Sequence, residues 1–255
     1  LGCCQKQDAV SLSHPRRCLV DIVEVCRHTG NHTFVCFAVT FCQKISMSHT
    51  IVNIKNWPRR EHFEFFSQFD EPFFGVNVKV DFTGCYLRAK QRGESFFIHY
   101  MHAVLKALNQ VENLKYRIQG DAVVLYESIG VSATIARDSG TFGFSHIPFY
   151  KDFDGFLAAA KEEILRVQAR TDLQLDVAGD DVVHFSALPW LDFTSISHAR
   201  NFKFQDSCPK ISVGKLTETD GKYFMPVSIH VHHGLADGIH VGQFVQHLEN
   251  EVGGV

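Results

Sequence analysis

The sequence predicts an α/β protein, a two-layer sandwich built on a large mixed β-sheet. Segments with helical periodicity and segments with strand alternation follow one another between residues 47 and 250. Such a mixture favours helices packed on a sheet with parallel and antiparallel pairings. No repeat, low-complexity tract or Gly/Ser-rich linker interrupts this region, so we expect one domain. The composition, 45% hydrophobic and 21% charged, is that of a globular protein.

The first half of this region contains two predicted helices with a strand between them. Residues 59–69 are predicted to form a short helix, because Phe63, Phe66 and Phe69 are spaced for one face. Residues 74–82 alternate apolar and polar side chains, which is typical of a half-buried strand. Residues 94–109 place a stripe of apolar side chains on one side of a second helix.

The second half is richer in strands. Strands are predicted over residues 123–126, 132–136, 145–149, 182–188, 210–216 and 223–233. Residues 153–169 repeat apolar side chains at helical spacing, and either Asp152 or Asp154 would serve as the N-cap. A last helix is predicted over residues 238–249.

Residues 1–46 differ from the rest of the chain. They hold six of the eight Cys and show no sustained helical or strand period. Their apolar stretch at residues 34–41 is too short to span a bilayer, so we expect no membrane anchor. We therefore expect residues 1–46 to be a non-native or disordered extension, with the natural start at Met47, and residues 47–255 to form the functional domain. The two remaining Cys, Cys85 and Cys208, suit a reducing cytoplasm.

Charge and aromatic content limit the partners. A formal net charge of -3 without a run of Lys and Arg gives no reason to expect nucleic acid. The 23 Phe indicate broad apolar faces, which would suit a subunit interface or an apolar ligand pocket as well as a core.

The end of the strand at residues 223–233 carries the strongest candidate for chemistry. His233 follows an apolar series on one face of this strand, and Gly234 then frees the backbone to turn. Asp237 and Gly238 begin the last helix. A His placed at a strand end beside a turn is well placed to act as a general base.

Other interpretations of these residues stay open on spacing alone. A His at a strand end is more often structural, and Asp-Gly is more often a turn or a helix cap. His230 and His232 share a strand face and could chelate a metal, although no third ligand of suitable spacing is evident. Cys85 or Cys208 is a weaker candidate for a nucleophile. A serine hydrolase is disfavoured because no Gly-x-Ser-x-Gly elbow is present.

Three motifs resemble those of chloramphenicol acetyltransferases in the CoA-dependent acyltransferase superfamily. The segment His233-Gly234-Leu235-Ala236-Asp237-Gly238 resembles the superfamily signature His-x-x-x-Asp-Gly. Residues 56–63, Asn-Trp-Pro-Arg-Arg-Glu-His-Phe, resemble the opening motif of the family, and residues 186–190, Ser-Ala-Leu-Pro-Trp, resemble a family strand. The match covers residues 50–249 and implies that residues 47–255 are an acetyltransferase domain without a metal.

The resemblance implies direct acetyl transfer from acetyl-CoA to a hydroxyl of chloramphenicol, which would give antibiotic resistance, without an acyl-enzyme. His233 would be the general base, with one ring nitrogen held by its own backbone carbonyl. Ser186 would stabilise the oxyanion, and Ser212 would help to hold a water. Asp237 would pair with Arg59, which is preferred over Arg60 by its position in the motif.

The resemblance also implies the acceptor pocket and the assembly. Phe66, Phe142, Ile196 and His198 occupy positions that line the antibiotic site of the family. Phe66 stands where the family commonly has Tyr, and Ile196 and His198 replace larger or more apolar side chains, which weakens the case for chloramphenicol itself. The family is trimeric with each site between subunits. The alternatives are an acyltransferase acting on another hydroxyl and a catalytically silent binding protein of the same fold.

Overall fold

The computed structural model describes residues 20–29, 33–42, 48–173, 179–203 and 205–253. The chain divides into two compact units, Leu1–Ser46 and Met47–Val255. In the first unit, β1 (Val20–Thr29) pairs antiparallel with β2 (Thr33–Cys42). Residues 1–46 were expected to show no sustained strand period, and this was wrong for the residues of β1 and β2. β1 contains three Val and one Ile, and β2 contains three Phe, two Val and two Thr, residue types that favour strands even where apolar and polar residues do not alternate. That residues 1–46 are an extension stays a prediction.

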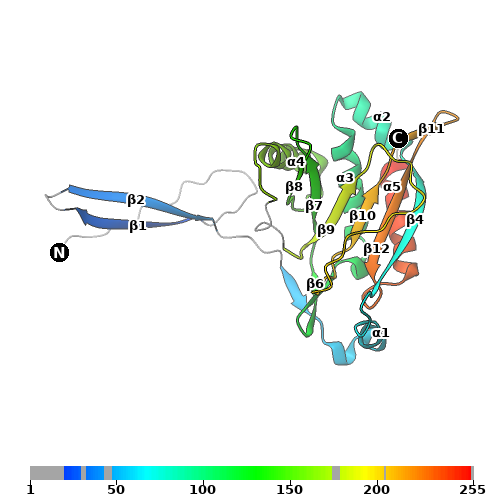
Figure 1. Cartoon of the computed structure of the whole chain (residues 1–255), viewed down its shortest axis with the longest axis horizontal. Helices are drawn as coiled ribbons and strands as arrows, with labels where there is room; N and C mark the ends of the chain where they lie inside the picture. The colour runs from blue at the N-terminus through cyan, green and yellow to red at the C-terminus, as the bar shows by residue number, and fades with distance from the viewer. Residues whose placement is uncertain (1–19, 30–32, 43–47, 174–178, 204, 254–255) are drawn as a thin grey trace. The chain divides into compact units, whose positions relative to one another are not determined.

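A seven-stranded mixed sheet forms the centre of the second unit (Figure 1). Its order is β11 (Thr217–Thr219), β12 (Lys222–His232), β10 (Lys210–Val213), β9 (Val182–Ala187), β7 (Gly130–Ala136) and β8 (Phe142–Phe144), and β4 (Phe73–Asp81) also pairs with β12. The pairs β10–β9 and β9–β7 are parallel, and the other pairs are antiparallel. The predicted mixed sheet is confirmed.

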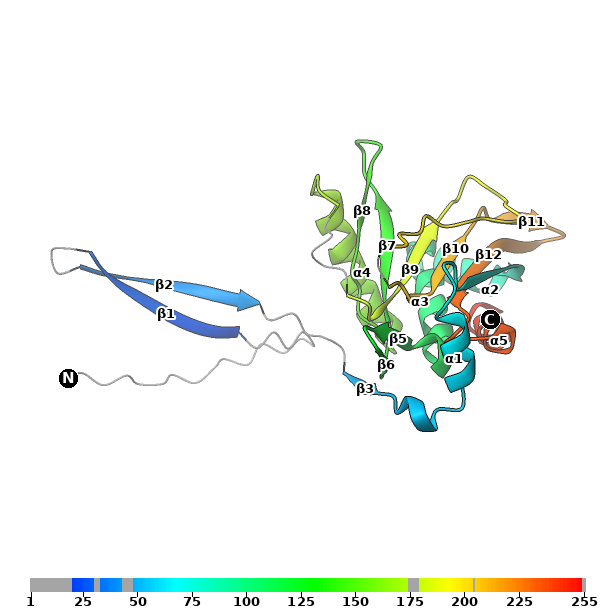
Figure 2. The same ribbon diagram turned by 60° about the horizontal axis from the view of Figure 1, so that its bottom comes forward.

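One layer of helices covers this sheet (Figure 2). The layer contains α2 (Thr83–Arg92), α3 (Phe96–Asn109), α4 (Phe153–Gln168) and α5 (Gly238–Gly253). The α3 helix is apolar on most sides, and ten of its fourteen residues are buried because neighbouring helices as well as the sheet cover it. The two-layer sandwich is therefore confirmed. In the described part of the chain, no helix combines the length and the apolar character needed to cross a bilayer.

The element boundaries differ from the predictions in a few places. The α2 helix was missed because only the small residues Gly84, Cys85 and Ala89 are buried on it, so no strong apolar stripe marks it. The strand predicted at residues 145–149 was wrong. There only Ile147 forms an isolated bridge, to Val131, and Pro148 lacks the N–H that a ladder needs.

Two further predictions needed smaller corrections. The strand predicted over residues 210–216 ends at Val213, and the next strand, β11, begins at Thr217. The first helix, α1, is shorter than predicted and spans Arg60–Phe66. Asp152, not Asp154, caps α4 by accepting a hydrogen bond from the Gly155 N–H at 2.7 Å.

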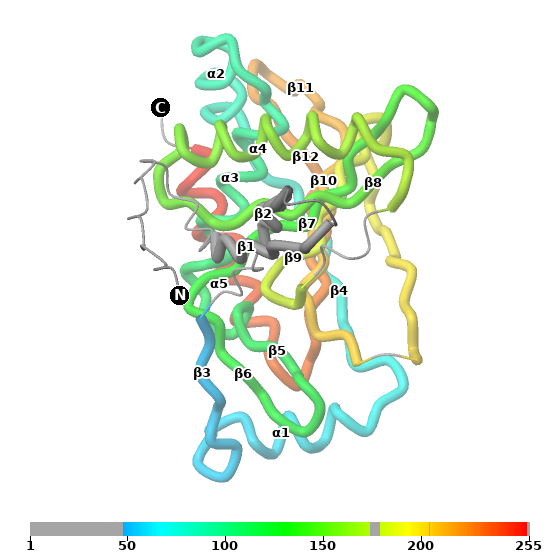
Figure 3. The backbone as a smooth tube through the Cα atoms, turned by 90° about the vertical axis from the view of Figure 1, so that its left-hand side faces the viewer, coloured from blue at the N-terminus to red at the C-terminus, as the bar shows by residue number. Residues whose placement is uncertain are grey.

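A second, smaller core lies beside the start of α1, against three strands whose backbones Figure 3 shows near α1. A three-stranded sheet of β3 (His49–Ile51), β6 (Ala122–Tyr126) and β5 (Tyr116–Gln119) forms one side of it, next to the short helices η1 (Ile54–Asn56) and η2 (Glu112–Leu114). The buried side chains of Trp57, Tyr116, Val123 and Leu235 pack together, and Phe63 of α1 packs against them. Because Leu235 belongs to the turn after β12, this core fixes that turn against α1.

Arg117 connects the small sheet to the large one. Its side chain is fully buried, and its guanidinium donates to four carbonyl oxygens at 2.6–2.9 Å. The acceptors belong to Leu114, Tyr116, Asp180 and Val182. The guanidinium has five N–H donors, more than any other side chain, and can therefore satisfy acceptors from several segments at once.

We expect Arg117→Met to lower the free energy of unfolding by at least about 3 kcal/mol, because four buried carbonyl groups lose their donor. Urea unfolding at a fixed protein concentration measures the change. The matched control is Arg60→Met, because Arg60 is about half exposed and pairs only with Glu64 on its own helix. That variant should leave the free energy of unfolding almost unchanged, because ion pairs on an exposed surface contribute little to stability. Equal losses in both variants would contradict the role of Arg117.

Candidate active site

His233 lies in a turn just beyond the end of β12, against two aromatic rings. Its ring stacks on Phe66 at a centroid distance of 4.0 Å and an interplanar angle of 8°, and it tilts against Phe74 at 4.5 Å. Its backbone N–H donates to the Pro72 carbonyl at 2.8 Å. The side chain is 35% exposed, so the imidazole is neither sealed in the core nor free in solvent.

The two ring nitrogens of His233 have different surroundings. Nδ1 is buried without a hydrogen-bond partner and lies 3.3 Å from Asp237 Oδ1. The expectation that the backbone carbonyl of His233 holds one of its ring nitrogens is not met, because Nδ1 has no hydrogen-bond partner. The carbonyl accepts a hydrogen bond from Arg59 Nη2 at 2.9 Å instead. Burial of Nδ1 leaves Nε2 as the ring nitrogen that a substrate can reach.

Arg59 and Asp237 fix this turn from both sides. The Arg59 guanidinium donates to both carboxylate oxygens of Asp237 through Nη1 and Nη2, and its Nε approaches the Gly234 carbonyl at 3.4 Å. The Arg59 side chain is only 11% exposed. The hydrogen bond from Arg59 is the main reason that the pKa of Asp237 is lowered, so Asp237 remains a carboxylate. Arg60, the alternative at the adjacent position, pairs with Glu64 instead.

The remaining backbone groups of the turn also have partners. Asn113 Nδ2 donates to the Leu235 carbonyl at 2.9 Å, and the N–H of Gly234 donates to Nδ1 of His232 at 3.1 Å. Gly234 has to be small, since an added Cβ would lie 3.0 Å from the His232 ring and 3.4 Å from the Cα of Phe63. The turn is thus held in one conformation, and the position of His233 is fixed before any substrate arrives.

Ser186 and Ser212 belong to a row of polar side chains that crosses four strands. Ser186 in β9 is in register with Ser212 in β10, Ser212 with Ser228 in β12, and Ser228 with Asn77 in β4. The side-chain oxygens Ser212 Oγ, Ser228 Oγ and Asn77 Oδ1 are buried without hydrogen-bond partners. Such atoms are expensive to bury, so this row is a site for water or a ligand. Sequence analysis missed Ser228 and Asn77, because only the register shows that they extend the row.

Ser186 and His233 do not meet within one chain. Ser228 precedes His233 by five residues, which is about 17 Å along a strand. Ser186 lies two strands further across the sheet. Phe142, 45% exposed, lies on β8 at the far edge of the same sheet. Of the predicted pocket residues, only Phe66 contacts His233.

Ile196 and His198 lie over His230 of β12. The His198 and His230 rings contact edge to face with centroids 4.8 Å apart, and both Nε2 atoms are buried without partners. Burial lowers the pKa of His230, and a hydrogen bond to the Ile196 backbone opposes part of this shift. Among the residues that the structure describes, no three His, Cys, Asp or Glu side chains are placed to hold a metal.

Neither cysteine in this unit is suited to act as a nucleophile. Both Cys85 and Cys208 are free and buried. Burial raises the pKa of the Cys85 thiol to about 12 and also raises that of Cys208. A thiol that stays protonated at neutral pH is a poor nucleophile.

An apolar groove of about 640 Å³ lies on the face of the sheet that the helices cover. Phe96, Phe97 and Tyr100 of α3 line it together with Ala187, whose side chain points to the opposite face of the sheet from that of its neighbour Ser186. Trp190, 76% exposed, and the cation Lys215 stand at this groove.

Comparison with known proteins gives one consistent family. The family model described as chloramphenicol acetyltransferase matches residues 47–249. "Chloramphenicol acetyltransferase 3" from Escherichia coli is 28% identical over 206 residues, which cover 80% of this chain and 96% of that protein. A solved structure described as "chloramphenicol acetyltransferase" superposes with a TM-score of 0.75 at 32% identity, covering 80% of this chain and all of that chain.

A second solved structure extends the fold comparison. It is described as a probable dihydrolipoamide acetyltransferase from Listeria monocytogenes and has a TM-score of 0.55 at 19% identity. It covers 76% of this chain and 88% of that one, so it supports the shared fold only.

We expect His198→Leu to make stability less dependent on pH in the acid range. Burial, with repulsion from His230, Lys210 and Arg200, lowers the pKa of His198 from 6.5 to about 4. Between pH 6.5 and 4 the unfolded chain therefore binds a proton that the folded chain does not, and the free energy of unfolding falls as the pH falls. The loss for this one group is about 2 to 4 kcal/mol.

Urea unfolding of both proteins at pH 7, 5.5 and 4 measures this effect. The difference in the free energy of unfolding, variant minus wild type, should grow in favour of the variant as the pH falls. A difference that stays constant with pH would show that His198 does not titrate in this way.

Proposed function

The chain belongs to the chloramphenicol acetyltransferase family, and from this premise we propose that it transfers the acetyl group of acetyl-CoA to a hydroxyl of chloramphenicol or of a related acceptor. The observation that carries the proposal is the position of His233. Its imidazole is stacked on Phe66, its turn is fixed by Arg59, and Nε2 is the nitrogen left accessible. This arrangement suits a general base for an alcohol.

In the proposed reaction, His233 Nε2 removes the proton from the acceptor hydroxyl as its oxygen attacks the thioester carbonyl. The tetrahedral intermediate collapses, its C–S bond breaks, and the imidazolium returns the proton to the CoA thiolate. The acetyl ester and free CoA thiol are the products. Asp237, 3.3 Å from Nδ1, stabilises the imidazolium while it lasts. No acyl-enzyme is needed, in keeping with the two protonated, buried cysteines.

We propose that Ser186 donates a hydrogen bond to the oxyanion and that Ser212 holds a water beside it. Both hydroxyls lie in the polar row, which lacks enough partners of its own. Because Ser186 and His233 of one chain are far apart, each site requires His233 of one copy and Ser186 of another. A trimer closes such head-to-tail contacts into a ring.

Membership of the chloramphenicol acetyltransferase family supports acetyl-CoA as the co-substrate. Acetyl-CoA is a metabolite of the cell interior, and we place the enzyme in the cytoplasm on that ground.

The assay that tests this function mixes the purified protein with acetyl-CoA and chloramphenicol and follows the release of free CoA thiol. We expect His233→Ala to lower kcat by at least about a hundredfold, because general base catalysis contributes about 10² to 10⁴ in rate. Gel filtration should show that the variant keeps the size of the wild type. The matched control is His62→Ala, since His62 is exposed on α1. Near-normal turnover in His233→Ala would rule out His233 as the base.

The placement of sites between subunits gives a separate prediction. His233→Ala and Ser186→Ala chains should each be inactive alone. Unfolding and refolding them together in equal amounts should restore roughly a quarter of wild-type activity, because one site in four then receives both intact residues. Mixtures that stay as inactive as the single variants would show that each site lies within one chain.

A further inference from the structure

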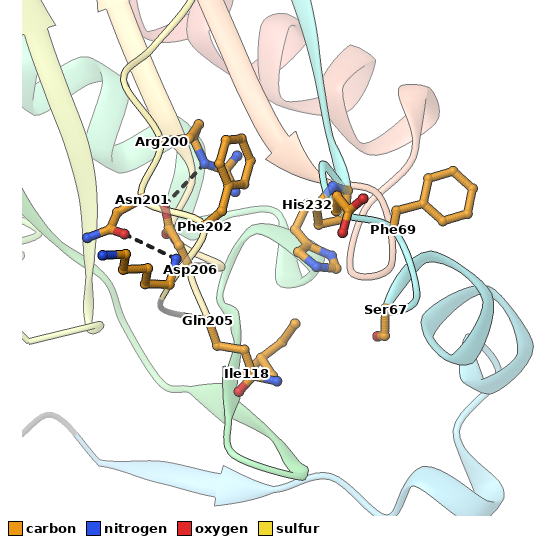
Figure 4. Close-up of a pocket in the computed structure, with 12 residues that line it drawn as sticks. Ser67, Phe69, Ile118, Arg200, Asn201, Phe202, Gln205, Asp206 and His232 are labelled. Atoms are coloured by element: carbon orange, nitrogen blue, oxygen red, sulfur yellow. Dashed lines mark hydrogen bonds and ion pairs between the residues drawn. The ribbon is translucent and has the colours of Figure 1, made fainter.

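The turn that carries His233 is flanked by two other histidines, and each accepts one of its backbone N–H groups. His232, the last residue of β12, accepts the Gly234 N–H through Nδ1 at 3.1 Å and lines a polar cleft of about 370 Å³ (Figure 4). His240, in the first turn of α5, accepts the Asp237 N–H through Nδ1 at 2.9 Å. His232 thus connects the turn to the strand before it, and His240 connects it to the helix after it.

Each of the five N–H groups of residues 233–237 has an acceptor. Four of them bind Pro72 or His232, which precede the turn in the sequence. The fifth, the N–H of Asp237, is the one that binds a residue after the turn, His240. A partly buried N–H group that loses its acceptor is costly, so removal of the His240 ring would destabilise the turn at Asp237.

The contact between His240 and Asp237 is one half of a capping box. Asp237 directly precedes α5, and its carbonyl accepts the N–H groups of His240 at 3.0 Å and Val241 at 3.2 Å, so it is the N-cap residue. His240 is the third residue of the helix, the position from which a side chain reaches back to the N-cap N–H. An N-cap Asp usually bonds its own helix through its carboxylate, but here both carboxylate oxygens accept hydrogen bonds from Arg59. The His240 ring therefore holds the N-cap residue while the carboxylate is used elsewhere.

The His240 ring serves as a neutral acceptor. Because Nδ1 accepts a hydrogen bond, the proton of the neutral ring is on Nε2. Burial is the main reason that the pKa of His240 is lowered, and the nearby Arg59 cation lowers it further, against the attraction of Asp237. A Glu, which is common at this position of a capping box, would repel the Asp237 carboxylate. A neutral ring holds the backbone of Asp237 without that repulsion.

The position of Asp237 bears directly on the proposed base. Its Oδ1 lies 3.3 Å from Nδ1 of His233, and in the proposed reaction this carboxylate stabilises the imidazolium. Arg59 binds the carboxylate and His240 binds the backbone N–H, so the side chain and the backbone of Asp237 are fixed by separate groups. A displacement of about 1 Å at a positioning group is enough to lower an enzymatic rate strongly. The hydrogen bond to His240 is therefore expected to influence the transfer without contact with the substrates.

We propose that His240 is a positioning residue for the acetyl transfer, in which its Nδ1 holds the Asp237 N–H and thereby keeps the Asp237 carboxylate beside the His233 ring. This inference rests on the proposed function for the reaction and on the hydrogen bonds of the turn for the role of His240. The effect falls on kcat, because the imidazolium that Asp237 stabilises exists only while the transfer proceeds.

The test compares the wild type with His240→Gln and His240→Leu in the assay with acetyl-CoA and chloramphenicol. Gln keeps a neutral acceptor at the capping-box position, whereas Leu has none. We expect His240→Leu to lower kcat at least about tenfold, with the KM for both substrates changed less than about twofold. His240→Gln should keep at least about a third of the wild-type kcat, because the acceptor is restored.

The matched control is His247→Leu, since His247 is also a half-buried histidine of α5 and lies two helical turns further along. It should behave as wild type. Thermal unfolding and gel filtration check that every variant is folded and keeps the size of the wild type.

Hydrogen exchange separates this inference from the function, because it needs no turnover. Exchange at the Asp237 amide, measured by mass spectrometry with electron-transfer fragmentation, should be at least about tenfold faster in His240→Leu than in the wild type and in His240→Gln. If the wild type does not acetylate chloramphenicol but exchange follows this order, the function fails and the hold of His240 on the turn stands. If the wild type is active and His240→Leu keeps its kcat, if His240→Gln loses as much kcat as His240→Leu, or if exchange at Asp237 is equal in all three proteins, the inference is overturned while the function stands.

Discussion

The contact between Arg59 and the turn after β12 is the constraint on which the rest of the site depends. One guanidinium binds the Asp237 carboxylate and the carbonyl of His233, and it comes from the residue just before α1. The turn at residues 233–236 would otherwise leave carbonyl groups without partners in a partly buried place. Arg59 satisfies them and orients Asp237 toward Nδ1 of His233. The small core around Trp57 and Leu235 keeps the two segments together, so the geometry does not depend on the ion pair alone.

The sheet divides the chemistry between two regions. At one end of β12, the His233 ring is 35% exposed, and it stacks on Phe66. In the middle of the sheet, hydroxyl and amide groups from four strands form a buried row without enough partners. Neither region alone can both remove a proton and stabilise an oxyanion. If a second copy placed its polar row next to His233 of the first copy, one site would contain both a base and an oxyanion donor. The groups of the first copy would also provide partners for the buried hydroxyls.

Most of the fold could be predicted from the sequence because its strands and helices carry clear periods. The strands at residues 74–82 and 223–233 and the helices at residues 94–109 and 153–169 lie within two residues of β4, β12, α3 and α4. The α2 helix could not be found, since small buried residues leave no apolar stripe. The motifs placed His233, Arg59 and Asp237 on the right segments. They could not show the row through Ser228 and Asn77, which depends on strand register.

His232 and His233 are adjacent in the sequence, but their burial and hydrogen bonds differ, so they are suited to different roles. His232 is 5% exposed, and its Nδ1 is occupied by the Gly234 N–H, so it is fixed as a neutral donor toward the cleft. His233 is 35% exposed, and its backbone, not its ring, receives the hydrogen bonds of the turn. A base must accept and release a proton in each cycle, which a ring committed to a backbone N–H cannot do without breaking that bond. The turn that begins at His233 therefore makes this residue better suited than His232 to the proposed proton transfer.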